Sequence, residues 1–535
     1  MLNFMSFRST FPSQRFGHSR RPGRGGLACA AAVVVAVAAS LMASASSKPK
    51  YPPEQSERKS STRHEGSFTI HPDAAQQVVW GMGFEIQSDS IASGNKGISE
   101  SMTSVPHDLV PSERDRLADE MLKGFRYCRL AGGLYWRGVD AEQKHLQPRW
   151  PEQLTELKAL LDRAGVESLS FEYWSPAPFW KANRGFVHPK GQPWGNQLRC
   201  FATAHFAEDP DYHGDVAKFL SDFADAVCAD IRTLQAAGLK VGFFGLQNEP
   251  FASTGYPCCT YSIADYGKTF RAVAPAIRKL DPSIKIIADT GPEEPKFIAP
   301  VLEDPSAASL VDLLVIHACG RDSNSVMPDV IRARKMVHQP LPIYQNEYEY
   351  LSGGASKSRC VNTVQNIMNW YQLAASPTWY WIHCLKPVGN SEGSGYALGF
   401  WQPAGAEQAE GSADLQPGHF KWNNYNWFSV VGFLKYMPWD STVVKMTEGE
   451  PDGDARLLAF KRPDGKLVVV VSNRSGKPFT FSIETGLSPA SRVAGFRYTP
   501  EDAGPDFRGQ PIGSGDGAHL KVTVPDLSWE FWVQQ

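Results

Sequence analysis

This chain of 535 residues lacks an excess of charge of either sign. Its 54 lysines and arginines nearly balance its 56 aspartates and glutamates, and the net charge is −2. Proteins that bind nucleic acids or anionic membranes through electrostatics usually carry clustered basic residues. The composition therefore points to neither a nucleic acid nor a membrane surface as a partner.

Sequence patterns for metals and nucleotides are also missing. No group of Cys and His residues has the spacing of a zinc site. Gly81-Met-Gly83 lacks the third glycine and the following helix signal of a dinucleotide-binding loop. We therefore expect no metal, and a doubly wound nucleotide-binding sheet is the less favoured of the α/β folds.

Only one long apolar run occurs, from Leu27 to Met42, and it is short for a membrane span. Arginines precede it, and Ala43-Ser-Ala45 after it fits a signal-peptidase site. We expect residues 1–45 to be a signal peptide and residues 46–66, rich in Ser, Lys, Pro and Arg, to be a disordered linker. The mature protein would be secreted or periplasmic, without a membrane partner once the signal is removed.

Eight cysteines remain after the signal segment, and an even number in an exported protein permits disulfide bonds. Cys128, Cys319 and Cys384 lie in or at the ends of apolar strands, where buried free thiols are equally expected. The loop residues Cys200, Cys258 and Cys259 are the better disulfide candidates. Cys228 and Cys360 complete the set.

Strand-like apolar segments alternate with helical patterns between about residues 78 and 435. The segments are 78–84, 124–130, 167–174, 241–246, 284–289, 311–317, 343–347 and 378–383. Eight alternations over this length are typical of an α/β fold, the (β/α)8 TIM barrel. We predict a catalytic barrel over residues 80–438. Long connections after the first, third and eighth strands would form the walls of a substrate cleft.

The pattern changes after residue 440 to short strands separated by turns such as Arg462-Pro-Asp-Gly465. This spacing predicts an antiparallel β-sandwich side domain over residues 439–535. The short segment Ser67–Ile70 also reads as a strand. We expect residues 67–79 to add an N-terminal strand to the same sandwich.

Two glutamates end apolar runs of the predicted barrel. Glu249 lies in Gln247-Asn-Glu-Pro250, and Glu347 lies in Gln345-Asn-Glu-Tyr348. Barrel enzymes carry their catalytic groups at the carboxyl ends of the strands, and two such carboxyl groups are what glycosidic bond hydrolysis requires. We interpret Glu249 as the general acid/base and Glu347 as the nucleophile. Asn-Glu-Pro could instead be a simple helix start, and Glu349 is the second choice for the nucleophile.

Further polar and aromatic residues lie at predicted strand ends. Asn248 could bond the sugar 2-hydroxyl, and Arg129 needs a carboxylate partner, either Glu347 or a structural one. His317 could bond the nucleophile or a sugar, or could be a core histidine. The remaining candidates for substrate binding are three tryptophans that are either sugar platforms or core residues: Trp174, Trp180 and Trp381.

Several segments together resemble glycoside hydrolase family 30. They are Glu172-Tyr-Trp-Ser-Pro-Ala-Pro-Phe-Trp-Lys181, Asn248-Glu-Pro250, Val315-Ile-His317, Asn346-Glu-Tyr348, the helix at Tyr425–Tyr436, and the last strands. The resemblance covers nearly all of residues 67–535. It implies a retaining barrel enzyme with Glu249 on strand four as acid/base, Glu347 on strand seven as nucleophile, and no cofactor.

The resemblance has two departures. Gly81-Met-Gly-Phe-Glu-Ile-Gln87 differs from the usual Gly-Phe-Gly-Gly, so we expect Glu85 to meet the reacting sugar. The arginine-bearing, glucuronate-binding loop of the family's xylanases is not apparent.

The function we expect is that of a secreted retaining glycoside hydrolase. It would cleave β-glycosidic bonds in a β-glycan or its oligosaccharides by double displacement. One alternative is a non-catalytic carbohydrate-binding barrel. Another is a related exo-β-glycosidase such as a β-xylosidase or β-glucuronidase.

Overall fold

The computed structural model describes residues 60–87, 90–97, 106–188, 195–202, 204–288, 298–336, 341–388, 395–403, 415–501 and 509–535. The predicted signal peptide and residues 46–59 of the predicted linker lie outside these ranges. Within these ranges, no helix has both the length and the apolar character needed to cross a bilayer.

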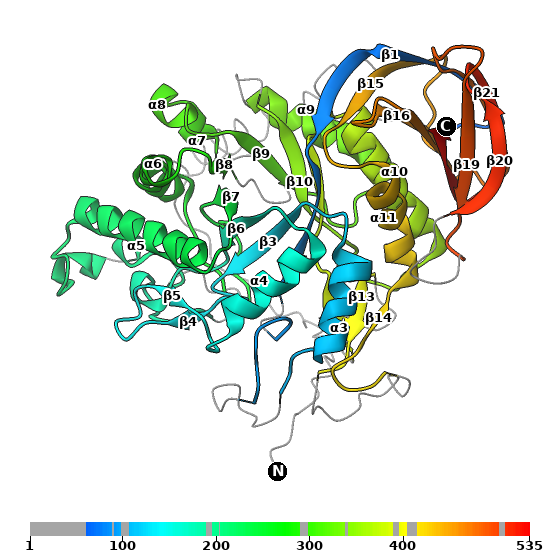
Figure 1. Cartoon of the computed structure of the whole chain (residues 1–535). Coiled ribbons are helices and arrows are strands. Elements are labelled where there is room, and N and C mark those ends of the chain that lie inside the picture. The colour runs from blue at the N-terminus through cyan, green and yellow to red at the C-terminus, as the bar shows by residue number, and fades with distance from the viewer. Residues whose placement is uncertain are drawn as a thin grey trace, which may run out of the picture. The chain divides into compact units, whose positions relative to one another are not determined.

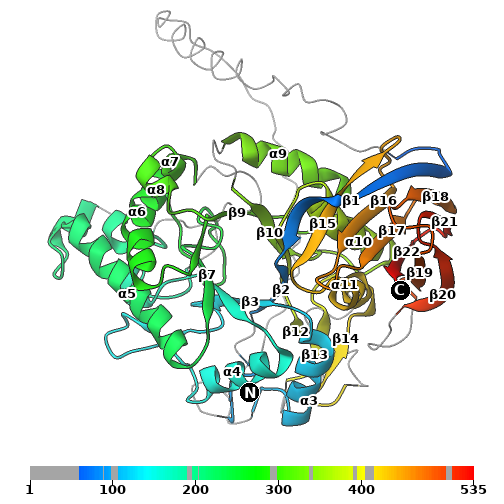
Figure 2. The same ribbon diagram turned by 45° about the horizontal axis from the view of Figure 1, so that its top comes forward.

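Eight parallel strands close into a barrel (Figures 1 and 2). In barrel order they are β2 (Gly81–Ile86), β3 (Tyr127–Gly132), β6 (Ser168–Tyr173), β7 (Val241–Gly245), β8 (Lys285–Ala288), β9 (Leu313–His317), β10 (Ile343–Tyr348) and β11 (Thr378–Trp381). Pairing of β11 with β2 closes the ring. The predicted (β/α)8 barrel is confirmed, and closure excludes the doubly wound sheet.

Helices follow most of the barrel strands. They are α3 (Pro111–Arg116) with a wider π-type turn (Leu117–Leu122), α4 (Gln153–Ala164), α5 (Val216–Ala236), α6 (Ile263–Leu280), α7 (Ala299–Leu302), α8 (Pro305–Ala308), α9 (Val326–Met336), α10 (Lys357–Gln372) and α11 (Asn424–Tyr436). Local sequence sets their ends: the side chains of Asp215 and Ser262 cap α5 and α6, and Gly165 ends α4 with φ 77°.

Short elements fill the connections. They are the strands β4 (Gly138–Val139), β5 (Leu146–Gln147), β12 (Leu385–Pro387), β13 (Gly399–Trp401) and β14 (Phe420–Trp422), and the 3-10 turns Pro178–Trp180, Arg199–Phe201, Ala204–Glu208 and Ser323–Ser325.

The barrel interior changes from apolar to polar along the strands. A buried layer near the strand starts contains Tyr127, Phe243, Ile287, Leu313, Val315, Tyr344 and Tyr380. Side chains two residues apart share one face of a strand. Tyr127 is therefore followed on its face by Arg129, and Val315 by His317. This alternation gathers the polar groups at the carboxyl ends of the strands.

The second domain is a nine-stranded sheet that folds around its own apolar core. Its order is β20 (Gln510–Asp516), β19 (Arg492–Tyr498), β22 (Ser528–Gln534), β17 (Leu467–Asn473), β16 (Ala455–Lys461), β15 (Ser441–Glu448), β1 (Glu65–Val79), β18 (Phe479–Glu484) and β21 (His519–Val524). The N-terminal strand β1 pairs antiparallel with β15 and parallel with β18. The β-sandwich half of the predicted fold is confirmed.

Helices α10 and α11 lie between the barrel strands and the sandwich (Figures 1 and 2). Gln372 of α10 donates to the Val444 carbonyl at 3.0 Å and accepts from the Ala459 amide at 3.0 Å. Phe433 of α11 packs on Phe531 of β22, with ring centroids 5.3 Å apart. The two domains therefore share one continuous apolar core.

Disulfide bonds are not supported by the structure. Cys128, Cys200, Cys228, Cys258, Cys259, Cys319, Cys360 and Cys384 are all free thiols, and every one except Cys319 is buried. The loop cysteines are enclosed rather than surface-exposed. The Cys258 sulfur, for example, accepts a hydrogen bond from the Asn196 amide at 2.9 Å.

Candidate active site

A buried arginine organises the carboxyl end of the barrel. Arg129 Nη1 donates to Glu85 Oε2 at 2.7 Å and to Glu347 Oε1 at 2.5 Å. Arg129 Nη2 donates to Glu172 Oε2 at 2.6 Å and to Asn248 Oδ1 at 2.8 Å. The guanidinium carbon also lies 4.4 Å from the centre of the Trp174 ring. The predicted pairing of Arg129 with Glu347 is present in this cluster.

The carboxylates around Arg129 have different surroundings. Glu172 also accepts from the Asn346 amide at 2.9 Å, so both of its oxygens have donors. Burial, together with the nearby charges of Glu347 and Glu172, raises the pKa of Glu85 to about 8, although Arg129 opposes the rise. Glu85 is fully buried below the cleft and does not line it. Its predicted contact with the reacting sugar stays a prediction.

An irregularity in β10 places neighbouring residues on the same side of the strand. The pairing of β10 with β9 shifts register between Gln345 and Glu347. Asn346 can then reach Glu172 while Glu347 reaches Arg129. Without the shift, consecutive side chains would point to opposite faces of the strand.

His317 at the end of β9 lies between the two candidate catalytic carboxylates. Its Nδ1 is 3.1 Å from Glu249 Oε1 and 3.2 Å from Glu347 Oε2. One ligand atom from each of these three residues lies within 4.8 Å of the others. Among the described residues, only this group is close enough to hold a metal ion. The existing contacts with His317 and Arg129 account for the same clustering without a metal.

Glu249 has an unusual backbone conformation. Its φ is 43°, in the left-handed region that residues with a Cβ rarely adopt. The flanking backbone is tied down, since the Asn248 amide donates to the Tyr173 carbonyl and the Tyr261 amide donates to the Pro250 carbonyl, both at 2.7 Å. Such strain persists where the surrounding structure fixes it, and it is concentrated at functional sites.

The ionisation of Glu249 depends on its burial and on its charged neighbours. Burial acts to raise its pKa, but the hydrogen bond and charge of His317, with the charge of Arg129, hold the pKa below its usual value. In the ligand-free protein Glu249 is therefore ionised at neutral pH. The contact with His317, which the sequence did not pair with Glu249, is the cause.

A cleft of about 590 Å³ opens above these carboxylates, a size that fits a small-molecule site. Four of the residues singled out from the sequence line this cleft: Trp174, Asn248, Glu249 and Glu347. The other lining residues are Gln87, Leu134, Tyr256, Leu351, Ile382, His383, Lys386, Pro387 and Tyr396. Gln87 and Tyr396 come from the long connections after the first and eighth barrel strands.

Two predicted tryptophans lie away from the cleft lining. Trp180 is buried against Phe219 and Phe223 of α5. Trp381 is fully buried beside Trp379 and Tyr348. Their packing gives them a core position, and we leave both out of the proposed site.

Glu349 lies behind the cleft rather than in it. It is fully buried, and its oxygens contact His383 Nδ1 at 2.7 Å and the Ala397 amide at 3.2 Å. Burial raises its pKa to about 8. A nucleophile must be ionised and must reach the substrate, so this position favours Glu347 over Glu349.

Sequence reasoning missed Glu172, Tyr256, His383 and Lys386. Glu172 had a detectable signal, because it lies in a predicted strand two residues from Trp174 and on the same face. His383 is the last residue of the eighth predicted strand, but it was not among the predicted site residues. Tyr256 and Lys386 lie outside the eight strand segments that the periodicity identified, so no pattern marked them.

Comparison with known proteins agrees with this architecture. Residues 440–525 match the family model described as the glycosyl hydrolase family 30 beta sandwich domain. The resemblance to glycoside hydrolase family 30 is confirmed. No curated protein matches the chain in sequence.

Solved structures share the fold at low sequence identity. A family 30 subfamily 8 xylanase from Clostridium acetobutylicum has a TM-score of 0.58 and 16% identity, over 88% of this chain and 99% of its own. A conserved exported protein from Bacteroides fragilis has a TM-score of 0.66 and 13% identity, over 87% and 100%. An endo-β1,6-glucanase has a TM-score of 0.61 and 14% identity, over 87% and 94%. At these identities the likeness establishes the fold alone.

Proposed function

We propose that this protein is a secreted retaining glycoside hydrolase that cleaves β-glycosidic bonds in a β-glycan or its oligosaccharides. The observation that carries the proposal is the closeness of Glu249 and Glu347, whose nearest oxygens lie within 4.8 Å across His317. Retaining enzymes keep their two carboxyl groups about 5–5.5 Å apart, whereas inverting enzymes need about 6.5–9.5 Å to admit a water. Export rests on residues 1–45 and stays a prediction.

In the first step Glu347 attacks the anomeric carbon while Glu249 gives its proton to the leaving glycosidic oxygen. The carbon–oxygen bond breaks, and a glycosyl ester forms on Glu347. In the second step the Glu249 carboxylate takes a proton from water. The water oxygen attacks the anomeric carbon and releases Glu347.

The buried cluster supports the nucleophile in this scheme. Fully buried Arg129 donates to Glu347 Oε1 at 2.5 Å, and this charge-assisted hydrogen bond fixes the position of the attacking carboxylate. Arg129 also holds the Asn248 oxygen, which leaves the Asn248 amide nitrogen to donate toward a sugar hydroxyl in the cleft.

His317 is assigned the part of a hydrogen-bond donor shared between the two carboxylates. Its Nδ1 carries at most one hydrogen, yet it contacts both Glu249 and Glu347. When Glu249 takes up from solvent the proton that it later gives to the leaving oxygen, the Nδ1 hydrogen stays on His317 and is donated to the Glu347 carboxylate instead. We propose that His317 thereby donates to whichever of the two carboxylates is ionised during turnover.

A non-catalytic carbohydrate-binding barrel is the alternative from another class. It would keep the aromatic and amide groups of the cleft but would have no need for a strained Glu249 above a buried arginine. An exo-β-glycosidase, such as a β-xylosidase or β-glucuronidase, would use the same carboxyl groups. An assay with both small β-glycosides and polymeric β-glycans distinguishes these three functions.

The test is hydrolysis of a panel of chromogenic β-glycosides and of β-glucans and xylans. Wild type is compared with Glu249→Gln, Glu347→Gln and the matched control Glu349→Gln. The proposal predicts cleavage of at least one panel member, loss of activity in Glu347→Gln, and a reduction of about 10²–10⁴-fold in Glu249→Gln. Full activity in Glu347→Gln would contradict it. Sugar binding without cleavage by wild type would support the binding barrel.

A further inference from the structure

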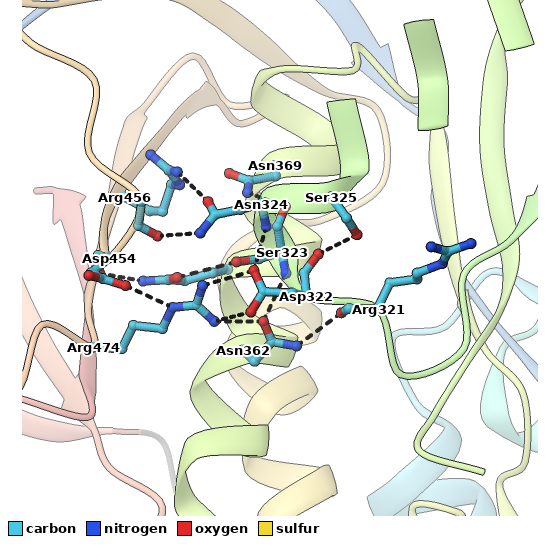
Figure 3. Close-up of polar contacts among 12 residues, drawn as sticks. Arg321, Asp322, Ser323, Asn324, Ser325, Asn362, Asn369, Asp454, Arg456 and Arg474 are labelled. Carbon is cyan, nitrogen blue, oxygen red and sulfur yellow. Dashed lines mark hydrogen bonds and ion pairs between the residues drawn. The ribbon is translucent and has the colours of Figure 1, made fainter. Parts of the chain in front are cut away.

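The segment after β9 attaches the barrel to the sandwich. It runs from Ala318 to Ser325 and begins directly after His317. Asn324 lies against the sandwich, donating to the Gly453 carbonyl at 3.1 Å and accepting from Arg456 at 2.8 Å. Figure 3 shows this segment between α10 and the loops that precede β16 and follow β17.

Arg474, the first residue after β17, joins three elements. Its two terminal nitrogens bond the two Asp322 oxygens at 3.1 and 3.0 Å, and Nη1 also donates to Asn362 Oδ1 at 2.7 Å (Figure 3). Its Nε lies 3.4 Å from Asp454. The side chain is only 14% exposed. Partial burial raises the pKa of Asp322, but the hydrogen bond and charge of Arg474 outweigh it and hold the pKa below its usual value.

Asn362 of α10 links Arg474 to the barrel through hydrogen bonds. Its oxygen accepts from the Ser323 amide at 2.8 Å as well as from Arg474. Its nitrogen donates to the Arg321 carbonyl at 3.0 Å and to the hydroxyls of Tyr348 and Tyr350 at 3.2 and 2.8 Å. Every polar atom of this buried amide is therefore used to hold the segment after β9 against the end of β10.

The segment after β9 and the end of β10 directly adjoin the proposed catalytic groups. Tyr348 directly follows Glu347, and the Glu347 carbonyl accepts from the Ala318 amide at 3.1 Å and from the Cys319 thiol at 3.5 Å. Ala318 directly follows His317. A displacement of the segment after β9 would therefore move His317 and the Glu347 backbone together.

We propose that Arg474 of the sandwich is a positioning residue for Glu347 and His317, acting through Asp322 and Asn362. The sandwich then contributes to the geometry of the reaction as well as to stability. This inference rests on the proposed function, because it assigns Glu347 and His317 to the reacting pair. It requires no direct contact between the sandwich and the substrate.

The test compares Arg474→Gln with Arg497→Gln. Arg497 is also a half-buried sandwich arginine, but its ion pair with Glu530, at 2.6 Å, lies within the sandwich. A shift of the nucleophile costs turnover rather than binding, since small misplacements of reacting groups lower rates steeply. We expect kcat to fall about 10-fold or more in Arg474→Gln with KM nearly unchanged. Arg497→Gln should keep kcat, although both variants melt at lower temperature.

Two further variants separate positioning from stability. Arg474→Lys keeps the charge but loses the planar fork that reaches Asp322 and Asn362 together, so we expect it to resemble Arg474→Gln. Tyr348→Phe removes a hydroxyl from the same network. Its effect on kcat should combine with that of Arg474→Gln less than additively, because both changes release the same contact.

The inference is overturned if Arg474→Gln keeps the wild-type kcat, or if both arginine variants lose kcat in proportion to their melting temperatures. A wild type that cleaves nothing refutes the proposed function instead. In that case crystal structures of wild type and Arg474→Gln still decide the positioning role. The inference predicts displaced Glu347 and His317 side chains in the variant, and unchanged positions would refute it.

Discussion

At the scale of single residues, one guanidinium faces several buried carboxyl groups. Arg129 contacts Glu85, Glu172 and Glu347, and a single positive charge cannot compensate three negative charges in a site this dry. The raised pKa of Glu85 reflects this excess. The hydrogen bonds from Arg129 to Glu347 and Glu172, at 2.5 and 2.6 Å, are shorter than its bond to Glu85 at 2.7 Å.

The first prediction at this scale concerns His317 and pH. The His317 hydrogen bond lowers the pKa of Glu249, and burial acts in the opposite direction. His317→Gln removes the charge, so the pKa of Glu249 should rise. The general acid must be protonated, and the alkaline limb of kcat/KM reports its pKa in the free enzyme. The limb should therefore move to higher pH in His317→Gln.

The measurement is the pH profile of kcat/KM for wild type, His317→Gln and His383→Gln. His383 also lines the cleft, but its contacts are with Glu349 and Gln87, so its variant should leave the alkaline limb in place. An unchanged or lowered limb in His317→Gln would contradict the assigned link between His317 and Glu249.

Sequence reasoning singled out charged or polar side chains that end apolar runs, and their catalytic roles stay predictions. Arg129, Glu249, His317 and Glu347 were found in this way, and the structure brings all four together. The tryptophans were harder, because the same side chain suits a sugar platform and a core. Only three-dimensional packing distinguishes Trp174 in the cleft from Trp381 in the core.

At the scale of elements, barrel strand β2 requires a small residue beside β11. A Cβ on Gly83 would lie 2.2 Å from the Tyr380 ring, in the packed interior of the barrel. Gly83→Ala should therefore destabilise the protein by about 1–3 kcal/mol through overpacking. Urea unfolding at equilibrium measures the change.

Gly255→Ala is the matched control. A Cβ on Gly255 would meet nothing within 4 Å, so the change in free energy of unfolding should stay within about 0.5 kcal/mol. Equal stability of the two variants would show that the barrel interior relaxes around Tyr380, contrary to the close packing described.

Elements themselves were largely predictable because buried parallel strands read as short apolar runs. All eight predicted segments overlap a barrel strand. The register shift in β10 had no sequence signal, since it depends on how β9 pairs with β10 in space. The small sheet β12–β13–β14 joins segments distant along the chain, so local pattern could not reveal it.

At the scale of the whole molecule, the barrel and the sandwich share a core. Phe433 of α11 packs against Phe531 of β22, and Gln372 of α10 bonds two sandwich strands. We predict a single unfolding transition for the full chain. Urea curves followed by tryptophan fluorescence and by far-ultraviolet circular dichroism should coincide. Two separate transitions would contradict the shared core.

The central claim is that Glu347 becomes covalently bound to the sugar during turnover. The direct measurement uses a 2-deoxy-2-fluoro analogue, with an activated leaving group, of the glycoside that the panel identifies as substrate. After incubation, mass spectrometry of the intact protein and of its peptides locates any bound sugar. The account predicts one fluoroglycosyl group per chain, on Glu347, and none in Glu347→Gln. A sugar on Glu349, or rapid turnover of the unmodified substrate without any trapped adduct, would contradict it.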